Sequence, residues 1–375
     1  MKYKLHILLP ISVFAFVILF SLYLDRKQFV SDILVCEKPL GEKPAPIRLL
    51  GLNEEFAGIA NRFEQTLAES TAVDFQVASS VISGPRSGDE SSLETLAALS
   101  RNNPQNQLAA VYALSACTKA ADHPACNDEI IDRAIALDGD NGAIWSLVSS
   151  LRYSQGDSYG AVLALEAAVD ASEYDDYFQR GLGIVLNALP PVDDDLIYRL
   201  LAGAMNHGVS LTIPGYASLL PIHEMCSAHV VENRALAAAC LSFGRRMEEQ
   251  ASSLIASALG LSLQISTYGG LGNVAEYQRL EERARKGQQD RVNSDFRPAF
   301  DLLEHDAQLT KYWFDQLIFS GEQAAVDSVV VEAKRLSSQW NYNPCPSVLF
   351  GKLLFVIKDF SRWALFRAQT KLNLG

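Results

Sequence analysis

The sequence predicts an all-α protein that follows an apolar N-terminal segment. From Gly51 onward, Ala/Leu-rich windows place apolar residues three and four positions apart, and β-branched runs are few. Apolar residues make up 49% of the 375 residues and charged residues 20%, which excludes disorder, collagen and a polytopic membrane protein. Lys and Arg number 32 against 44 Asp and Glu, giving a net charge of −12. This acidic balance disfavours nucleic acid as a partner.

Residues 1–27 predict a membrane anchor. The stretch Leu5–Leu24 carries no Asp, Glu, Lys or Arg, and as a helix it is long enough to cross a bilayer core of about 30 Å. Positive charge is slightly heavier on its N-terminal side, so we expect the N-terminus in the cytoplasm and the rest of the chain exported. No small-x-small cleavage pattern follows, which favours an uncleaved anchor over a removed signal peptide and secretion.

Six cysteines, all beyond the anchor, indicate structural disulfides in an oxidising compartment. They form no C-x-x-C pair, the spacing typical of thioredoxin-like redox sites and zinc ribbons. The sequence also contains no N-x-Ser/Thr acceptor site, which favours a bacterial envelope. We therefore expect a single-pass protein of the bacterial inner membrane with most of its chain in the periplasm. Buried free thiols in a cytosolic protein are the alternative.

The segments after the anchor differ in composition. Residues 28–50 contain the Pro-rich run Glu37–Pro46 and are expected to form a linker. Residues 51–101 are expected to form an N-terminal helical cap. Within this cap, Val73–Val77 alternates like a short strand, and Ser83–Ser92 is expected to be a flexible loop.

A repeat of 34 residues organises the next region. Ala134, Ala168 and Ala202 hold this spacing, and Ile131 and Leu165 repeat it three residues earlier. The period is that of stacked antiparallel helix pairs, whose apolar faces are buried only against neighbouring pairs.

The middle unit resembles the tetratricopeptide repeat family. The residues that match its W-x-x-L, turn and second-helix positions are Trp145, Val148, Gly156, Ala161, Leu165 and Ala168. Leu182-Gly183 matches the family's L-G pair in the third unit, whereas Ser149 and Arg152 depart from the pattern. The resemblance covers residues 102–208 and implies an α-solenoid of helix pairs over residues 102–210. A generic helical array is the alternative.

The cysteine spacing predicts three disulfides. In the first unit, Cys117 and Cys126 lie symmetrically about the turn between two helices, where side chains face each other. Cys226 and Cys240 lie seven residues on either side of Asn233, where one helix should end and the next begin. Cys36 and Cys345 remain, and pairing them would fasten the C-terminal end of the array near the membrane.

Two further segments complete the predicted organisation. Residues 211–347 are expected to form a C-terminal helical region, and residues 348–375 a basic amphipathic helix. The cations of this last helix are Lys352, Lys358, Arg362, Arg367 and Lys371. Such a helix suits an anionic lipid surface, and a capping helix packed on the array is the alternative.

Three motifs suggest chemistry but favour structural interpretations. Gly156–Gly160 matches G-x-S-x-G, yet it lies between two predicted helices, where Gly156 and Asp157 serve as turn and N-cap. His223, Cys226 and His229 do not share one helix face, so we predict no metal site. The glycine-rich stretch Ser266–Asn273 lacks a P-loop lysine and is expected to be a loop. No catalytic residue and no cofactor is predicted.

The leading hypothesis is therefore a membrane-anchored, envelope-facing scaffold that binds another protein or a peptide and is not an enzyme. The resemblance implies that first helices line a groove, whose residues would be Ser150, Tyr153, Tyr177, Arg180 and Asn187. An exported helical enzyme with an unrecognised active site and a structural tether without a groove are the alternatives.

Overall fold

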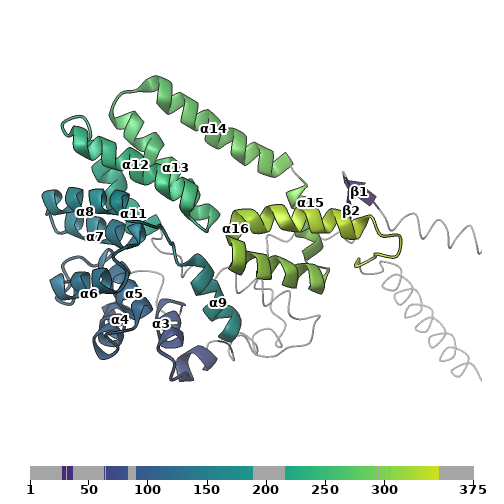
Figure 1. Cartoon of the computed structure of the whole chain (residues 1–375), viewed down its shortest axis with the longest axis horizontal. Helices are drawn as coiled ribbons and strands as arrows, with labels where there is room; N and C mark the ends of the chain where they lie inside the picture. The colour runs from purple at the N-terminus through teal and green to yellow at the C-terminus, as the bar shows by residue number, and fades with distance from the viewer. Residues whose placement is uncertain are drawn as a thin grey trace, which may run out of the picture. The chain divides into compact units, whose positions relative to one another are not determined.

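The computed structural model describes the chain in blocks, which form two compact units. The larger unit holds the described parts of 49–294 and 310–328, and the smaller holds those of 1–48, 295–309 and 329–375. Figure 1 shows that helices make up most of the described chain. The described residues are 28–30, 32–36, 63, 65–82, 90–188, 216–293, 295–303 and 305–345.

The larger unit begins with four helices that enclose the first core. They are α3 (Val73–Ile82), α4 (Glu90–Asn102), α5 (Gln107–Cys117) and α6 (Asp128–Asp138). Helix α5 packs against the other three and buries every residue from Leu108 to Leu114. Asn106 caps its N-terminus by accepting a hydrogen bond from the backbone N–H of Ala109.

The predicted strand at Val73–Val77 is wrong, because these residues form the first half of α3. Val73, Val77 and Val81 also recur every four residues, so the helical period was present alongside the alternation. Val77 is buried and the other two pack against the same core. A five-residue window was too short to separate the two periods.

The middle pair consists of α7 (Gly142–Ser154) and α8 (Ser158–Asp170), which pack against each other. The predicted turn at Gly156 is confirmed, since its φ of 83° lies in the left-handed region that favours glycine. The predicted N-cap is confirmed as well, because Asp157 accepts a hydrogen bond from the backbone N–H of Gly160 at 2.8 Å. Ala161, Leu165 and Ala168 are fully buried, as the repeat pattern predicts.

The next pair to stack on α7 and α8 is not the one that the 34-residue spacing predicts. Helix α9 (Phe178–Ala188), which contains Leu182-Gly183, packs against α3 instead. Helices α11 (Tyr216–Ala228) and α12 (Arg234–Gln250) pack against α7 and α8, respectively (Figure 1). Ala202 lies outside the described residues. The predicted helix break at Asn233 is confirmed, since Asn233 caps α12.

The two long helices that follow are α13 (Leu254–Gly270) and α14 (Val274–Asn293). Helix α13 packs against α11, α12 and α14. Gly244 of α12 and Gly260 of α13 meet so closely that a Cβ on Gly260 would lie 2.5 Å from the Gly244 carbonyl oxygen. The predicted loop at Ser266–Asn273 is largely wrong, because its first five residues belong to α13 and only 271–273 form the turn.

The smaller unit contains the two strands of the described chain. Strands β1 (Gln28–Val30) and β2 (Ile33–Val35) pair antiparallel, with Phe29 opposite Leu34. The expectation of a linker is therefore wrong at β1 and β2, the second of which contains the buried residues Ile33 and Leu34. Helix α15 (Phe296–Leu303) packs against β2, and the Leu34 backbone N–H donates to Ser337 Oγ at 2.9 Å.

Ser337 ends α16 (Ala307–Ser337), whose residues belong partly to each unit. The helix is interrupted at Gly321, where φ is 79° and ψ is 173°. Among the described residues, no helix is both long and apolar enough to span a bilayer. The predicted anchor at Leu5–Leu24 and the predicted basic helix at 348–375 both lie outside the described residues.

Candidate functional site

The five predicted groove residues do not share an exposed surface. Arg180 and Asn187 are exposed on α9, and Tyr153 is half-buried near the end of α7. Ser150 and Tyr177, however, have exposed fractions of 0% and 1%. The expectation of a solvent-facing groove built from all five residues is therefore wrong.

Ser150 is buried because α11 covers this face of α7. Its hydroxyl donates a 2.5 Å hydrogen bond to the backbone carbonyl of Ser218, near the start of α11. The residue therefore joins two packed helices, and its polar atom is satisfied within the protein.

Tyr177 is an anchor of the segment between α8 and α9. Its φ of 58° lies in a region that bulky residues rarely adopt, and the buried side chain fixes it there. The hydroxyl donates to a carboxylate oxygen of Asp138, which also accepts a hydrogen bond from Asn141 at 2.9 Å. Burial, followed by the bond to Asp138, raises the pKa of Tyr177. Tyr177 therefore fixes the backbone between α8 and α9, and its side chain is not available to a ligand.

Tyr153 faces a small polar cluster at the ends of α7 and α11. Its hydroxyl lies 3.2 Å from Nε2 of His229, and burial together with the nearby Glu224 raises the pKa of Tyr153.

His223 lies on α11, with Nδ1 3.5 Å from Ser266 Oγ, and burial lowers the pKa of His223. Cys226, the cysteine of the H-x-x-C-x-x-H motif, is bonded to Cys240 and therefore offers no thiolate to a metal ion. Across the described residues, no group of three or more His, Cys, Asp or Glu is arranged to hold a metal ion.

The six cysteines lie in the three predicted pairs, two of them predicted from spacing and the third by elimination. The Sγ–Sγ distances are 2.07 Å for Cys36–Cys345, 2.11 Å for Cys117–Cys126 and 1.98 Å for Cys226–Cys240. The first pair closes a separation of 309 residues within the smaller unit, whereas the other two are local to the larger unit.

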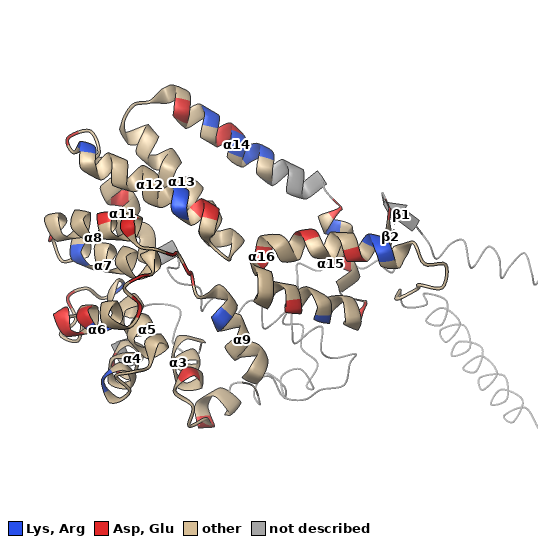
Figure 2. Cartoon of the chain, in the orientation of Figure 1, with Lys and Arg blue, Asp and Glu red and all other residues tan. Residues whose placement is uncertain are grey.

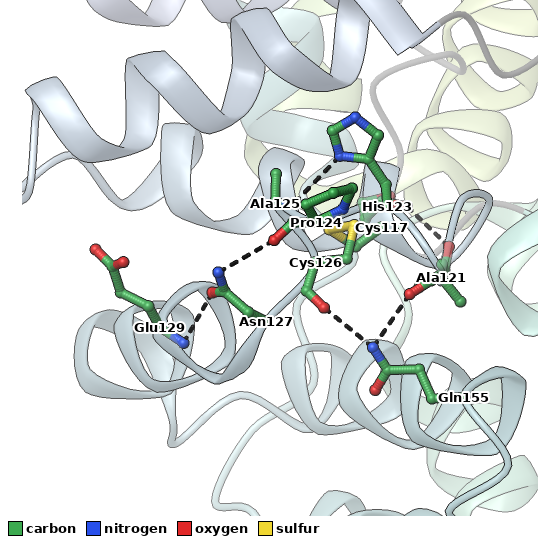
Figure 3. Close-up of a disulfide and its surroundings, with 11 residues drawn as sticks. Cys117, Ala121, His123, Pro124, Ala125, Cys126, Asn127, Glu129 and Gln155 are labelled. Atoms are coloured by element: carbon green, nitrogen blue, oxygen red, sulfur yellow. Dashed lines mark hydrogen bonds between the residues drawn. A yellow bond between two sulfur atoms is a disulfide. The ribbon is translucent and has the colours of Figure 1, made fainter.

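The Cys117–Cys126 bond fixes the connection between α5 and α6 (Figure 3). Cys117 is the last residue of α5, whereas Cys126 precedes α6 by two residues and is not on a helix. Gln155, from the turn after α7, donates to the carbonyls of Ala121 and Cys126 at 3.2 and 3.0 Å. The disulfide and these hydrogen bonds therefore hold the connection against the next helix pair.

A cleft that the sequence analysis missed lies between α12, α13 and α14. Its volume is about 280 Å³, and its charged residues are Arg245, Glu248, Glu249, Arg279 and Arg283. Gln264, Tyr268 and Leu280 complete the lining. Figure 2 shows acidic and basic residues interspersed along the described part of α14.

One of the two carboxylates in the cleft, that of Glu248, is hydrogen-bonded within the protein. Glu248 Oε2 accepts hydrogen bonds from Gln264 Nε2 and from an Arg283 nitrogen, both at 2.8 Å. Arg279 pairs at 2.7 Å with Glu276, one helical turn before it on α14. Arg245 makes no ion pair or side-chain hydrogen bond with any of the described residues. Its guanidinium group therefore keeps its donors available to a ligand.

A second, more open cleft of about 230 Å³ adjoins the first along α12. Arg245 and Glu249 line both clefts, and Val169, Ser242, Arg246 and Gln250 complete the second. Arg246 donates to the backbone carbonyl of Val169, so its side chain is held against the end of α8. Together the two clefts form a polar path across α12, from α14 to α8.

The arginines on α14 belong to the mixed-charge stretch Glu276–Arg291, whose pairs of opposite charge four residues apart are typical of a solvated helix face. Four-residue spacing places Arg279 and Arg283 on one side of that helix. Nothing in the sequence indicates that this side faces Arg245, because the contact depends on how α13 and α14 fold back on α12. The search of family models, curated proteins and solved structures found no match to this chain.

Proposed function

We propose that this protein is a membrane-anchored helical scaffold that binds another protein or a peptide on the exported side of a bacterial inner membrane. The observation that carries the proposal is the pair of adjoining clefts across α12, which share Arg245 and Glu249. An elongated path lined by charged side chains suits an extended polypeptide, which can place several polar groups along it. Binding, without catalysis, is the role that we assign.

The packing of the larger unit supports a scaffold. Helix α7 packs against α11, and α11 against α13, while α8 packs against α12. Helices that stack on their neighbours in this way build broad surfaces from short sequence segments, and in repeat proteins such surfaces bind partners. The resemblance of the middle pair to tetratricopeptide repeats points to the same role.

The disulfides support an exported location. Three cysteine pairs at bonding distance are typical of proteins that fold in an oxidising compartment. A non-reducing peptide map of the protein from native membranes tests this location. We expect all three cross-linked pairs and a peptide containing Leu5–Leu24. Six free thiols would contradict export, and loss of Leu5–Leu24 would identify a secreted protein.

Site-specific photo-cross-linking tests binding. A photoreactive amino acid is placed at Ser242 or Glu249, which are exposed and line the clefts, and at Asp132, an exposed position on α6, as the control. We expect a discrete cross-linked product from the two cleft positions and none from Asp132. The partner, identified by mass spectrometry, is then purified and titrated against the full chain. Equal cross-linking from all three positions would contradict a binding surface at α12.

A structural tether is the second candidate, and the Cys36–Cys345 bond favours it. Cys36 lies 12 residues after Leu24 of the proposed anchor, so the bond would hold residue 345 within about 40 Å of the membrane. The cross-linking experiment separates the two candidates, because a pure tether has no partner that depends on Ser242 or Glu249.

A further inference from the structure

We propose that the cleft between α12, α13 and α14 binds an acidic segment of the partner, with Arg245 as the main carboxylate-binding residue. This inference rests on the proposed function and names the chemistry of the partner.

The charges of the cleft favour an anionic ligand. Three arginines and two glutamates line it, so its formal charge is positive in a chain whose net charge is −12. Within the cleft, Glu248 is bound by Arg283 and Gln264, and just outside it Glu276 is bound to Arg279. These pairs hold their arginines in place and leave Arg245 and the exposed Glu249 as the two charged residues of the lining without a partner among the described side chains. A ligand carboxylate would therefore bind on the Arg245 side of the cleft.

A second donor lies in the same cleft. Tyr268, on the last turns of α13, is half-buried, and its hydroxyl forms no hydrogen bond with a described residue. A guanidinium group offers two parallel N–H donors that match the two oxygens of a carboxylate, and a phenol O–H can donate to a further acceptor. The two side chains together suit a carboxylate attached to a chain that carries other polar groups.

The shape of the site favours a peptide over a small free anion. Arg245 and Glu249 lie where the first cleft joins the second, and the second continues past Ser242 to the end of α8. A ligand bound at Arg245 can therefore extend in two directions along α12. A compact anion such as phosphate would use only the part nearest the guanidinium group.

Binding of a defined acidic peptide tests the inference. The probe is a fluorescein-labelled eight-residue peptide of alternating Glu and Ser, and the comparison peptide has Gln in place of Glu. Fluorescence anisotropy measures both against the full chain with its disulfides intact. We expect the acidic peptide to bind at least about tenfold more tightly than the Gln peptide, because a Gln amide oxygen still accepts a hydrogen bond but no longer carries the charge that pairs with Arg245. Its affinity should fall as salt is raised.

Arg245→Gln is the decisive variant, and Arg234→Gln is its matched control. Arg234 is exposed at the start of the same helix, so both changes remove one positive charge from α12. We expect Arg245→Gln to weaken binding of the acidic peptide about tenfold or more and Arg234→Gln to change it less than about twofold. Because Arg245 has no partner to lose within the described chain, the thermal unfolding midpoint should stay the same.

Three results would overturn the inference: no preference for the acidic peptide, equal losses in the two variants, or complete displacement of the peptide by equimolar inorganic phosphate. None of these would by itself contradict the scaffold. If one of these results is found while Ser242 of the wild-type chain still cross-links a partner, the scaffold stands and the acidic-segment inference fails. If the wild-type chain forms no cross-linked product at Ser242, the scaffold itself is contradicted.

Discussion

Ser253 donates two hydrogen bonds to one carboxylate oxygen of Asp176, from its backbone N–H at 3.0 Å and from its hydroxyl at 2.6 Å. The other oxygen of Asp176 accepts from the hydroxyl of Ser252 and from the backbone N–H of Phe178. Asp176 is fully buried, and Ser253 is the N-cap of α13. One carboxylate thus joins the connection before α9 to the start of a helix 77 residues later.

Replacement of Asp176 should therefore destabilise the larger unit. Asp176→Ala leaves the donors of Ser252 and Ser253 without their acceptor in a buried site, and the carboxylate no longer interacts with the N-terminus of α13. We expect the free energy of unfolding to fall by about 2–4 kcal/mol, measured by urea unfolding followed by circular dichroism. Asp132→Ala, at an exposed position on α6, should change it by less than about 0.5 kcal/mol. Equal effects would contradict the role of Asp176.

Substitution of two glycines by alanine should change the stability in opposite directions. A Cβ at position 260 would lie 2.5–2.6 Å from the Gly244 carbonyl oxygen, the Glu248 nitrogen and Met247 Cβ, so Gly260→Ala must push α12 and α13 apart. At Gly287, in the exposed helix α14, nothing lies within 4 Å of an added Cβ. We expect Gly260→Ala to lower the unfolding midpoint strongly and Gly287→Ala to raise stability by up to about 1 kcal/mol, because alanine is the better helix former. A neutral Gly260→Ala would contradict the close packing.

Two buried tyrosines should respond in opposite ways to loss of their hydroxyls at pH 7. Tyr177 donates to Asp138, so Tyr177→Phe removes a hydrogen bond to a charged group and should cost about 1.5–3 kcal/mol. The Tyr174 hydroxyl is buried and has no hydrogen-bond partner among the described residues, so Tyr174→Phe removes an unsatisfied polar atom. We expect Tyr174→Phe to be neutral or stabilising in urea unfolding. A larger loss at Tyr174 than at Tyr177 would contradict these assignments.

The same two tyrosines, together with the buried Tyr112 of α5, predict that the protein loses stability in alkali. Burial raises the pKa of Tyr112, Tyr174 and Tyr177 above the usual value near 10. A raised pKa means that the folded state holds the proton after the unfolded state has lost it, so stability is complete below pH 10 and declines as the pH rises further. The decline approaches about 1.4 kcal/mol per pH unit for each residue. Unfolding measured from pH 9 to 11.5 should show it, and Tyr177→Phe should make it shallower; an unchanged slope would contradict the burial.

Local sequence spacing was enough to predict the α7–α8 pair and the two local disulfides, and the Cys36–Cys345 pair followed by elimination. Gly156 and Asp157 specify the turn and cap within three residues, and Cys117 and Cys126 flank a single interhelical connection. The elements that escaped prediction depend on distant contacts. Helix α9 packs on α3, and Tyr177, the residue before it, is buried in the core that these two helices share.

The candidate cleft escaped prediction for the same reason. Arg245 and Arg279 are 34 residues apart in the sequence and meet at one cleft only because α13 runs back along α12 and α14 along α13. The burial of Ser150 likewise requires α11, whose contact with it is 68 residues away. Patterns within one helix pair could not show which surface the following helices would cover.

His223 gives the last prediction, a loss of stability in mild acid. Its pKa is lowered by burial, and its Nε2 atom is buried without a hydrogen-bond partner in the described part of the chain. The unfolded state therefore takes up a proton near pH 6.5 while the folded state resists it. Stability is present above pH 6.5 and is lost as the pH falls, at up to about 1.4 kcal/mol per pH unit. The leucine of His223→Leu cannot take up the proton. The urea unfolding midpoint of this variant should therefore rise relative to that of the wild type as the pH is lowered from 8 to 5. The pH 8 measurement corrects for any change in packing, and a constant difference across this range would show that His223 is not responsible.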